Sequence, residues 1–370
     1  MYLHELALIN FKSYAHFRES FSPGINLIVG PNGSGKTNLL DSIHMLAVGR
    51  GAFNHIDAQH IRWKSDFFTV KGSWHTEDDK SYEVQCSLER GKRKLLRCDN
   101  KEYERVSDHY GRFPVVLIAP YDTDLIREGN EIRRRFFDSI IAQLDRHYLN
   151  DLFQYQRLLK QRNEALKKMG EQRRTDPTLL AAYDAQLLPL NERIAKHRAA
   201  FTKAFWEDFI PHHQEVARQS EQVAIGYQSD VQQDDFDELF RQNQSRDLML
   251  QRTELGVHRD KYLFRIGGRS LKKFGSQGQQ KTFVLALKLT QFEVIRRERQ
   301  RTPVLLLDDI FDKLDTQRTR RLIELVRQQR FGQVFITDAT PERAGAFFQD
   351  FPEKPQFIYT TKAQESTEDR

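Results

Sequence analysis

The stretch Gly30-Pro31-Asn32-Gly33-Ser34-Gly35-Lys36-Thr37 decides the fold of this chain. It matches the pattern G-x-x-x-x-G-K-[ST], in which glycines let the backbone wrap around a phosphate with its N–H groups pointing inward. An apolar run at residues 25–29 precedes it and a helix-forming run follows, so the helix N-terminus adds a favourable dipole. We expect Lys36 to reach the β- and γ-phosphates of ATP and the Thr37 hydroxyl to ligate Mg²⁺. By chance, roughly 0.01 matches to this pattern are expected in a chain of this length. The alternative is a glycine-rich turn that binds no ligand.

A second apolar run, residues 303–307, ends in two carboxylates, Asp308 and Asp309. In phosphate-loop ATPases the strand beside the loop ends in an aspartate that holds Mg²⁺ directly or through water. We assign that role to Asp308, and we place Asp309 where a general base or a water-orienting carboxylate is needed. The alternative is a buried strand that ends in a helix N-cap, a position that suits aspartate.

A further short motif contains Ser276, Gly278 and Gln279 and opens a predicted helix. It resembles the signature motif of ABC-type ATPases in the form that DNA-repair members carry. There a serine hydroxyl, a glycine N–H and a helix N-terminus converge on the γ-phosphate held by a second subunit. A plain helix cap is the alternative. The order of the motifs along the chain, between the phosphate loop and the acidic strand end, favours the functional interpretation.

Downstream residues fit the same superfamily less closely. Asp315 resembles its D-loop, although Asp312-Lys313 stands where a Ser-Glu pair is more usual. The predicted strand at residues 334–337 ends at Thr337-Asp338, where a switch histidine is usual. Residues 119–122 take the place of the Q-loop without its glutamine. The identity of the Q-loop and switch residues is therefore left open.

The alternation of patterns along the chain predicts a split α/β domain. Residues 1–115 and 251–370 are rich in strands and turns, and residues 116–250 are mostly helical. Strand–helix alternation after residue 300 predicts a parallel sheet, and residues 67–70, 82–88 and 94–98 predict antiparallel strands. We therefore expect an ABC-type phosphate-loop ATPase head, with a parallel-sheet core and an antiparallel β-subdomain, interrupted by an inserted α-helical lobe. Pro189 is expected to kink or end a helix of that lobe.

Bulk composition limits the class of protein. The 370 residues are 39% hydrophobic and 30% charged, with a net charge of +6 and a pI near 9.1. This balance permits nucleic-acid binding without proving it. No run approaches the roughly 18 apolar residues of a membrane helix, and the start of the chain lacks the apolar centre of a secretion signal. Only two cysteines occur, Cys86 and Cys98, so we predict a cytoplasmic protein with reduced thiols.

Together these residues resemble the RecF family of ABC-type, SMC-like ATPases along nearly the whole chain. Three further stretches carry the resemblance: residues 8–14, the arginine-rich residues 132–138, and Gly256-Val257-His258-Arg259-Asp260, in which Val257 replaces a proline. The predicted insert of about 135 residues lacks the long heptad coil of SMC and Rad50-like relatives.

The resemblance implies an ATP-dependent, Mg²⁺-dependent DNA-binding protein of recombinational repair and replication restart. It implies a homodimer that closes with ATP on single- and double-stranded DNA at gaps, helps to load RecA, acts with RecO and RecR, and supports the SOS response. Asp309 in place of the more usual glutamate predicts slow ATP hydrolysis, as in a switch. The alternatives are an ATPase subunit that serves a membrane transporter, or one that serves a nuclease or anti-phage effector.

The residues that contact DNA are not identified by the sequence. Arg133, Arg134 and Arg135 either touch DNA phosphates or lie on a solvated helix face with their stems packed on the core. His258 either serves the nucleotide or is a structural histidine. Since no ladder of aromatic residues is evident, we expect sequence-independent, salt-sensitive contact with the DNA backbone.

Overall fold

The computed structural model describes residues 1–361 except 55, 77, 218–220, 314–315 and 329–330. The chain forms two compact units, Met1–Asp122 with Gln291–Arg370, and Thr123–Thr290. The expected split at 115/116 and 250/251 differs from these units for two physical reasons. Residues 115–118 form a strand of the first unit's sheet, and residues 261–266 pair with a strand of the second unit. The division into a head and an inserted lobe stays a prediction.

A five-stranded parallel sheet forms the centre of the first unit, in the order β14-β3-β13-β12-β8. The three inner strands are almost completely buried, as expected for parallel strands covered on both faces. The register pairs Leu307 with Ile118 and Asp338 with Val29, so the carboxyl ends of four strands align at one edge. The strands are β3 (Ile25–Val29), β8 (Val115–Ile118), β12 (Val304–Leu307), β13 (Val334–Asp338) and β14 (Gln356–Tyr359).

A six-stranded antiparallel sheet completes the first unit, in the order β2-β1-β4-β5-β6-β7. Helix α1 (Lys36–Val48) contacts β4 and β5 of this sheet and β8 and β13 of the parallel sheet, and one continuous apolar core joins them. The three antiparallel strands predicted between residues 67 and 98 are confirmed. The strands are β1 (Tyr2–Phe11), β2 (Tyr14–Ser20), β4 (Phe67–His75), β5 (Ser81–Glu89), β6 (Leu95–Cys98) and β7 (Lys101–Glu102). Short helices α10 (Ile310–Lys313), α11 (Thr316–Arg327) and α12 (Pro341–Ala346) follow β12 and β13.

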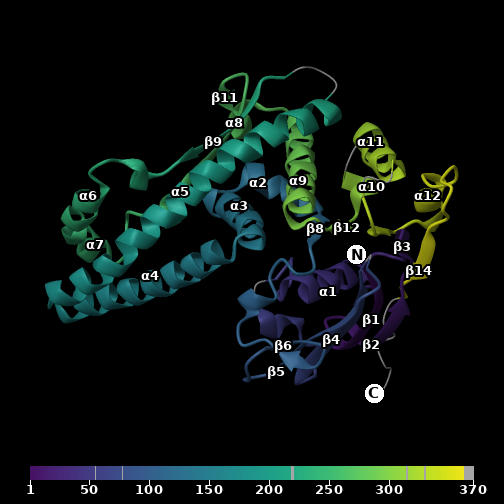
Figure 1. Cartoon of the computed structure of the whole chain (residues 1–370), viewed down its shortest axis with the longest axis horizontal. Helices are drawn as coiled ribbons and strands as arrows, with labels where there is room; N and C mark the ends of the chain where they lie inside the picture. The colour runs from purple at the N-terminus through teal and green to yellow at the C-terminus, as the bar shows by residue number, and fades with distance from the viewer. Residues whose placement is uncertain (55, 77, 218–220, 314–315, 329–330, 362–370) are drawn as a thin grey trace, which may run out of the picture. The chain divides into compact units, whose positions relative to one another are not determined.

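The second unit is mainly helical. The long helices α4 and α5 pack side by side, and a three-stranded sheet of order β11-β10-β9 accompanies them (Figure 1). Gly267 and Gly268 have φ values of 53° and 75°, which suits the two-residue hairpin turn between β10 and β11. The elements are α2 (Asp124–Arg127), α3 (Asn130–Leu144), α4 (Arg146–Gln172), α5 (Pro177–Val216), β9 (Val223–Gln228), α6 (Phe236–Gln242), α7 (Gln244–Leu250), β10 (Lys261–Ile266), β11 (Arg269–Ser270) and α8 (Leu271–Phe274), and α9 (Gln277–Arg299) crosses the boundary between the units.

Helix α5 runs through both Pro189 and Pro211. Pro189 was expected to kink or end its helix; it does not end it, because packing against α4 stabilises this segment beyond the backbone bond that proline removes. Pro177 occupies the first turn of α5, where proline is well tolerated. Among the described residues, none of the helices combines the length and the hydropathy that crossing a membrane requires.

Candidate nucleotide-binding site

The phosphate loop lies directly after β3, and two of its glycines adopt conformations that other residues rarely tolerate. Gly33 and Gly35 have φ values of 82° and 98°. A Cβ atom on Gly35 would lie 2.7 Å from the Ser13 Oγ and 2.8 Å from the Tyr14 hydroxyl oxygen. Any side chain there would displace either the loop or the turn between β1 and β2, so glycine is required by packing as well as by φ.

Hydrogen bonds to distant parts of the chain hold the phosphate loop in place. The Ser34 and Thr360 hydroxyls lie 2.6 Å apart, and the Thr360 N–H donates to the Val29 carbonyl at 2.8 Å. On the other side, the Asn38 amide donates to Ser13 Oγ at 2.9 Å. Sequence reasoning missed Thr360 and Ser13, since nothing in the local pattern around them indicates a phosphate loop.

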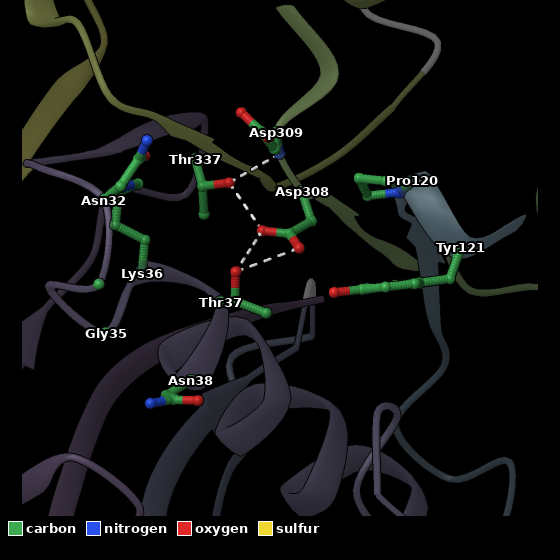
Figure 2. Close-up of a pocket in the computed structure, with 11 residues that line it drawn as sticks. Asn32, Gly35, Lys36, Thr37, Asn38, Pro120, Tyr121, Asp308, Asp309 and Thr337 are labelled. Carbon is green, nitrogen blue, oxygen red and sulfur yellow. Dashed lines mark hydrogen bonds between the residues drawn. The ribbon is translucent and has the colours of Figure 1, made fainter. Parts of the chain in front are cut away.

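The structure brings Lys36, Thr37 and Asp308 together at the pocket. The Lys36 ammonium donates to the carbonyls of Gly30 and Pro31 at 2.8 and 3.0 Å, and so lies across the loop. The Thr37 hydroxyl donates to the Asp308 carboxylate, at 3.0 and 3.2 Å from its two oxygens (Figure 2). Asp308 is buried, and burial raises its pKa although hydrogen bonds from Thr337 and Thr37 oppose this shift. The two oxygen-bearing side chains therefore converge at the mouth of the loop.

Asp309 lies beside this pair in an unusual backbone conformation. Its φ is 48°, in the left-handed region, and its N–H donates to the Thr337 hydroxyl at 2.9 Å. That hydroxyl in turn donates to Asp308 at 2.9 Å. Figure 2 shows Asp309, Thr337 and Asp308 linked in this chain of hydrogen bonds. Thr337 therefore fixes the turn on which both carboxylates sit.

Asp338 does not take part in the site. Its carboxylate accepts hydrogen bonds from the Arg343 guanidinium, one of them at 3.0 Å from Nε, and from the Thr340 N–H at 3.0 Å. Of the two residues that the sequence offered for the switch position, the structure places only Thr337 at the pocket.

A cavity of about 570 Å³ opens over the loop, and all the residues that line it belong to the first unit. Pro120 and Tyr121 of the predicted Q-loop region line it, together with loop residues, Asp308, Asp309 and Thr337. The Tyr121 side chain extends toward Thr37 and Asp308 (Figure 2), and its ring packs edge-on against Phe53 at 5.9 Å. The missing glutamine is thus replaced by an aromatic side chain at the edge of the pocket.

The pocket fits Mg²⁺ held jointly with a nucleotide. Mg²⁺ prefers one or two protein oxygens and completes its shell with phosphate oxygens and water. Thr37 and Asp308 offer one hydroxyl and one carboxylate within hydrogen-bonding distance of each other. In the described part of the chain, no group of three histidine, cysteine or acidic residues is placed to hold a metal. The donor set is therefore that of a metal brought in with phosphates.

A buried ionic cluster lies on α1, one turn after Thr37, and the sequence did not indicate it. The Asp41 carboxylate is 2.5 Å from the Lys12 ammonium and 3.2 Å from the His60 Nε2, and it accepts the Ala52 N–H at 2.6 Å. Burial alone would raise the pKa of Asp41, but the His60 hydrogen bond and the Lys12 charge together hold it well below its usual value. This cluster fastens residues 52–60 to the phosphate-loop helix.

The signature-like motif lies in the second unit and is capped reciprocally. The Ser276 Oγ accepts the Gln279 N–H at 3.2 Å, and the Gln279 side chain accepts the Ser276 N–H at 2.8 Å. The Gln279 amide also donates to Glu221 at 2.9 Å. Gly278 lies in the first turn of the helix, and Ser276 is exposed. The structure thus contains the helix cap, and the role of these residues toward a partner's phosphate stays a prediction, as does that of Asp315, which lies outside the described residues.

Arg133 and His258, for which the sequence left two interpretations each, both make contacts within the second unit. Arg133 is buried, and its guanidinium donates to the carbonyls of Leu125, Ile126 and Tyr262. His258 is hydrogen-bonded through both ring nitrogens, to the Tyr155 hydroxyl at 2.7 Å and to the Thr253 carbonyl at 3.0 Å. The guanidinium of Arg133 and both ring nitrogens of His258 are therefore bonded within the protein.

Comparison with known proteins places the chain in a defined group. A family profile described as the RecF/RecN/SMC N terminal domain matches residues 2–349. The DNA replication and repair protein RecF of Cytophaga hutchinsonii is 43% identical over 94% of this chain and 92% of its own length. The protein of the same name from Flavobacterium johnsoniae is 41% identical over 94% of this chain and 96% of its own length.

Solved structures agree with these relatives. The structure of the recombination mediator protein RecF-ATPrS in the RecFOR pathway superposes with a TM-score of 0.86 at 26% identity, over 98% of this chain and 96% of that one. The corresponding RecF-ATP structure has a TM-score of 0.84 at 28% identity, over 92% of each chain. The Smc head domain of Pyrococcus furiosus, at 18% identity and a TM-score of 0.51 over 92% and 90% of the chains, is similar in fold alone. The predicted fold class is confirmed.

Proposed function

The chain belongs to the RecF family, and from that premise we propose that it is an ATP-switched DNA-binding protein of replication and repair. The relatives are named for DNA replication and repair, and two similar structures hold RecF with nucleotide in the RecFOR pathway. Its ligand is ATP, and its partners in this proposal are gapped DNA and the recombination mediators RecO and RecR, which assist loading of RecA.

One observation supports ATP binding most directly. The Thr37 hydroxyl and the Asp308 carboxylate come from segments 271 residues apart, yet they meet at 3.0 Å beside a glycine loop and an open cavity. A loop that only made a turn would not require a buried carboxylate at this position, because burying a charge without compensation costs several kcal/mol. Mg²⁺ bound to a triphosphate supplies the missing positive charge.

The residues of the pocket have separable tasks in this proposal. The backbone N–H groups of Gly33 to Lys36 bind the phosphates, and Lys36 turns from the loop carbonyls toward the β- and γ-oxygens. Thr37 and Asp308 hold Mg²⁺, which neutralises phosphate charge. Asp309 orients the attacking water, and its position on a turn fixed by Thr337 gives it a defined direction.

A homodimer completes the nucleotide site in this proposal. The Ser276 hydroxyl is exposed at a helix N-terminus, where the helix dipole favours an anion. ATP bound to Lys36 of one copy would meet Ser276 of the other, so that two copies close together only when the nucleotide is bound. Hydrolysis or release of ATP would reopen them.

The dimer is tested by light scattering of the full chain with ATP, with ADP and without nucleotide. We expect the mass to double with ATP alone, and we expect Lys36→Arg and Ser276→Arg variants to remain monomeric. An equimolar mixture of the two variants retains one composite site out of two, so partial dimerisation of the mixture distinguishes loss of the site from misfolding. Dimerisation of either variant at the wild-type ATP concentration would contradict the proposal.

A further inference from the structure

Trp63 is the most exposed of the large apolar side chains in the described residues, with 84% of its surface open to solvent. It lies between the short 3₁₀ helix Asp57–His60 and β4, in residues 62–67, which we name the Trp63 turn. Tryptophan is costly to leave in water and is enriched at the centres of binding surfaces. We therefore take the exposed Trp63 as a candidate contact residue.

The backbone of the Trp63 turn is held at both ends. The Arg62 N–H donates to the Asn10 carbonyl at 2.9 Å, and the Ser65 N–H donates to the Arg62 carbonyl at 3.0 Å. Ile61, just before the turn, is buried and pairs with Phe11 of β1. The indole is thus presented from a fixed backbone, which lowers the entropy lost when a ligand is bound.

The same segment is fastened to the phosphate-loop helix. His60, three residues before Trp63, lies 3.2 Å from the Asp41 carboxylate of α1, and its carbonyl accepts the Lys12 N–H at 2.8 Å. Asp41 follows Thr37 by one helical turn. The Trp63 turn and the phosphate loop therefore belong to one packed body, joined through the cluster of Lys12, Asp41 and His60.

Basic residues lie next to Trp63 in the sequence and beside the Trp63 turn. Arg62 and Lys64 flank it in sequence, and the Arg90 N–H donates to the Asp66 carbonyl at 2.7 Å, which places Arg90 beside the turn. In the described part of the chain, no carboxylate forms an ion pair with Arg62, Lys64 or Arg90. Asp66 is the one acidic residue of the Trp63 turn, and Glu89, next to Arg90, is paired with Lys92.

An anionic ligand that also carries flat apolar groups satisfies both features, and single-stranded nucleic acid is such a ligand. Aromatic side chains stack on bases of any identity, and neighbouring cations follow the phosphates. Protein partners also use tryptophan anchors, but uncompensated cations on either side favour a polyanion.

We propose that the Trp63 turn contacts unpaired DNA, with the indole of Trp63 stacked on one base and Arg62, Lys64 and Arg90 facing the adjacent phosphates. The inference rests on the proposed function, because it supplies the single-stranded contact of a protein that binds gapped DNA. One aromatic platform provides for one base, which suits recognition of a gap rather than coverage of a long strand. The contact is independent of sequence and sensitive to salt.

Fluorescence of the full chain tests the stacking directly. The chain has three tryptophans, and Trp74 is buried in the core, so the wild-type emission minus that of Trp63→Phe isolates Trp63. We expect oligodeoxythymidylate to quench this difference signal. We expect Trp63→Ala to weaken binding to gapped duplex roughly 5- to 100-fold while binding to blunt duplex changes less than about 2-fold. Trp63→Phe, which keeps an aromatic face, should retain most of the affinity.

A matched control is Tyr359→Ala, which removes another exposed aromatic side chain of the same unit. It should leave binding to gapped duplex unchanged. If the wild-type chain binds gapped duplex but Trp63 is not quenched and Trp63→Ala binds equally well, the inference is overturned and the proposed function stands. If oligodeoxythymidylate quenches Trp63 while gapped duplex is not retained with ATP, the inference stands and the proposed function fails. Loss of binding to a protein partner alone, with DNA binding intact, would also overturn the inference.

Discussion

The nucleotide pocket of the first unit and the buried arginines of the second unit contain the same kinds of side chain in opposite settings. At the pocket, Lys36, Thr37 and Asp308 border a cavity of about 570 Å³. In the second unit, Arg198 is 2% exposed and donates to Asp138, Asp260 and the Val257 carbonyl. The first set is arranged around a space for a ligand, whereas the second is satisfied within the protein.

This difference between the two regions shows that a charged residue in a sequence does not indicate function until the groups that it contacts are known. Arg162 repeats the internal pattern, since it is fully buried and donates to Asp184 at 2.9 Å, to Asp247 at 2.7 Å and to Thr253 at 2.8 Å. Removing a residue of the second unit should therefore change stability, and removing a residue of the pocket should change ligand binding.

The largest expected effect is on the stability of the second unit. Arg198→Ala leaves the carboxylates of Asp138 and Asp260 buried without their counterion, so the free energy of unfolding should fall by about 3–5 kcal/mol. Arg193→Ala is the matched control, because Arg193 lies on the same helix and pairs with Asp151 at the surface. It should cost less than about 1 kcal/mol. Urea unfolding followed by circular dichroism measures both, and equal losses would break the comparison.

The next largest effect is a loss of affinity for ATP with little change in the free energy of unfolding. Lys36→Ala removes the ammonium that we assign to the β- and γ-phosphates, so the affinity for ATP should fall by roughly 100-fold or more. Its free energy of unfolding should change much less than that of Arg198→Ala, because the Lys36 ammonium donates to loop carbonyls that are only partly buried. Anisotropy of a fluorescent ATP analogue and urea unfolding provide the two readouts. Lys160→Ala, an exposed lysine of α4, should alter neither.

A smaller effect should appear with pH in both units. Burial lowers the pKa of His109 in the first unit and of His258 in the second to about 4, although each donates a ring N–H to a backbone carbonyl. Below pH 6.5 these two histidines bind protons in the unfolded chain, whereas in the folded chain they bind protons only near pH 4. Stability should therefore fall as the pH drops from 7 to 5, by about 2 kcal/mol for each histidine.

Variants assign this pH dependence to its source. In His109→Asn the loss of unfolding free energy between pH 7 and pH 5 should be smaller than in the wild type. Thermal or urea unfolding at the two pH values measures it. An unchanged pH dependence in this variant would show that other groups dominate.

Local patterns allowed the sequence to predict much of the pocket. The strand, the glycine loop and the helix are consecutive, and Asp308 follows an apolar run that could pair beside them. Contacts between distant segments were not predicted. Ser34 meets Thr360 across 326 residues, and Asp41 is joined to Lys12 and His60 only once the two sheets have packed around α1.

The second unit was harder to predict for a related reason. The arginine-rich segment at residues 133–135 permitted either DNA contact or packing, because the carbonyls that Arg133 binds come from separate elements. Pro189 was expected to interrupt a helix, and only the packing of α4 on α5 accounts for its tolerance. The hydrophobic periodicity indicated the helices, but it did not indicate which charged side chains would be buried and paired within the protein.

Retention of gapped duplex DNA by the full chain, measured with ATP, with ADP and without nucleotide, tests the central claim most directly. The account predicts retention with ATP at least roughly 10-fold stronger than in the other two states, and loss of this difference in Lys36→Ala. Equal retention in all three states would contradict it, because ATP binding would then leave the affinity for DNA unchanged.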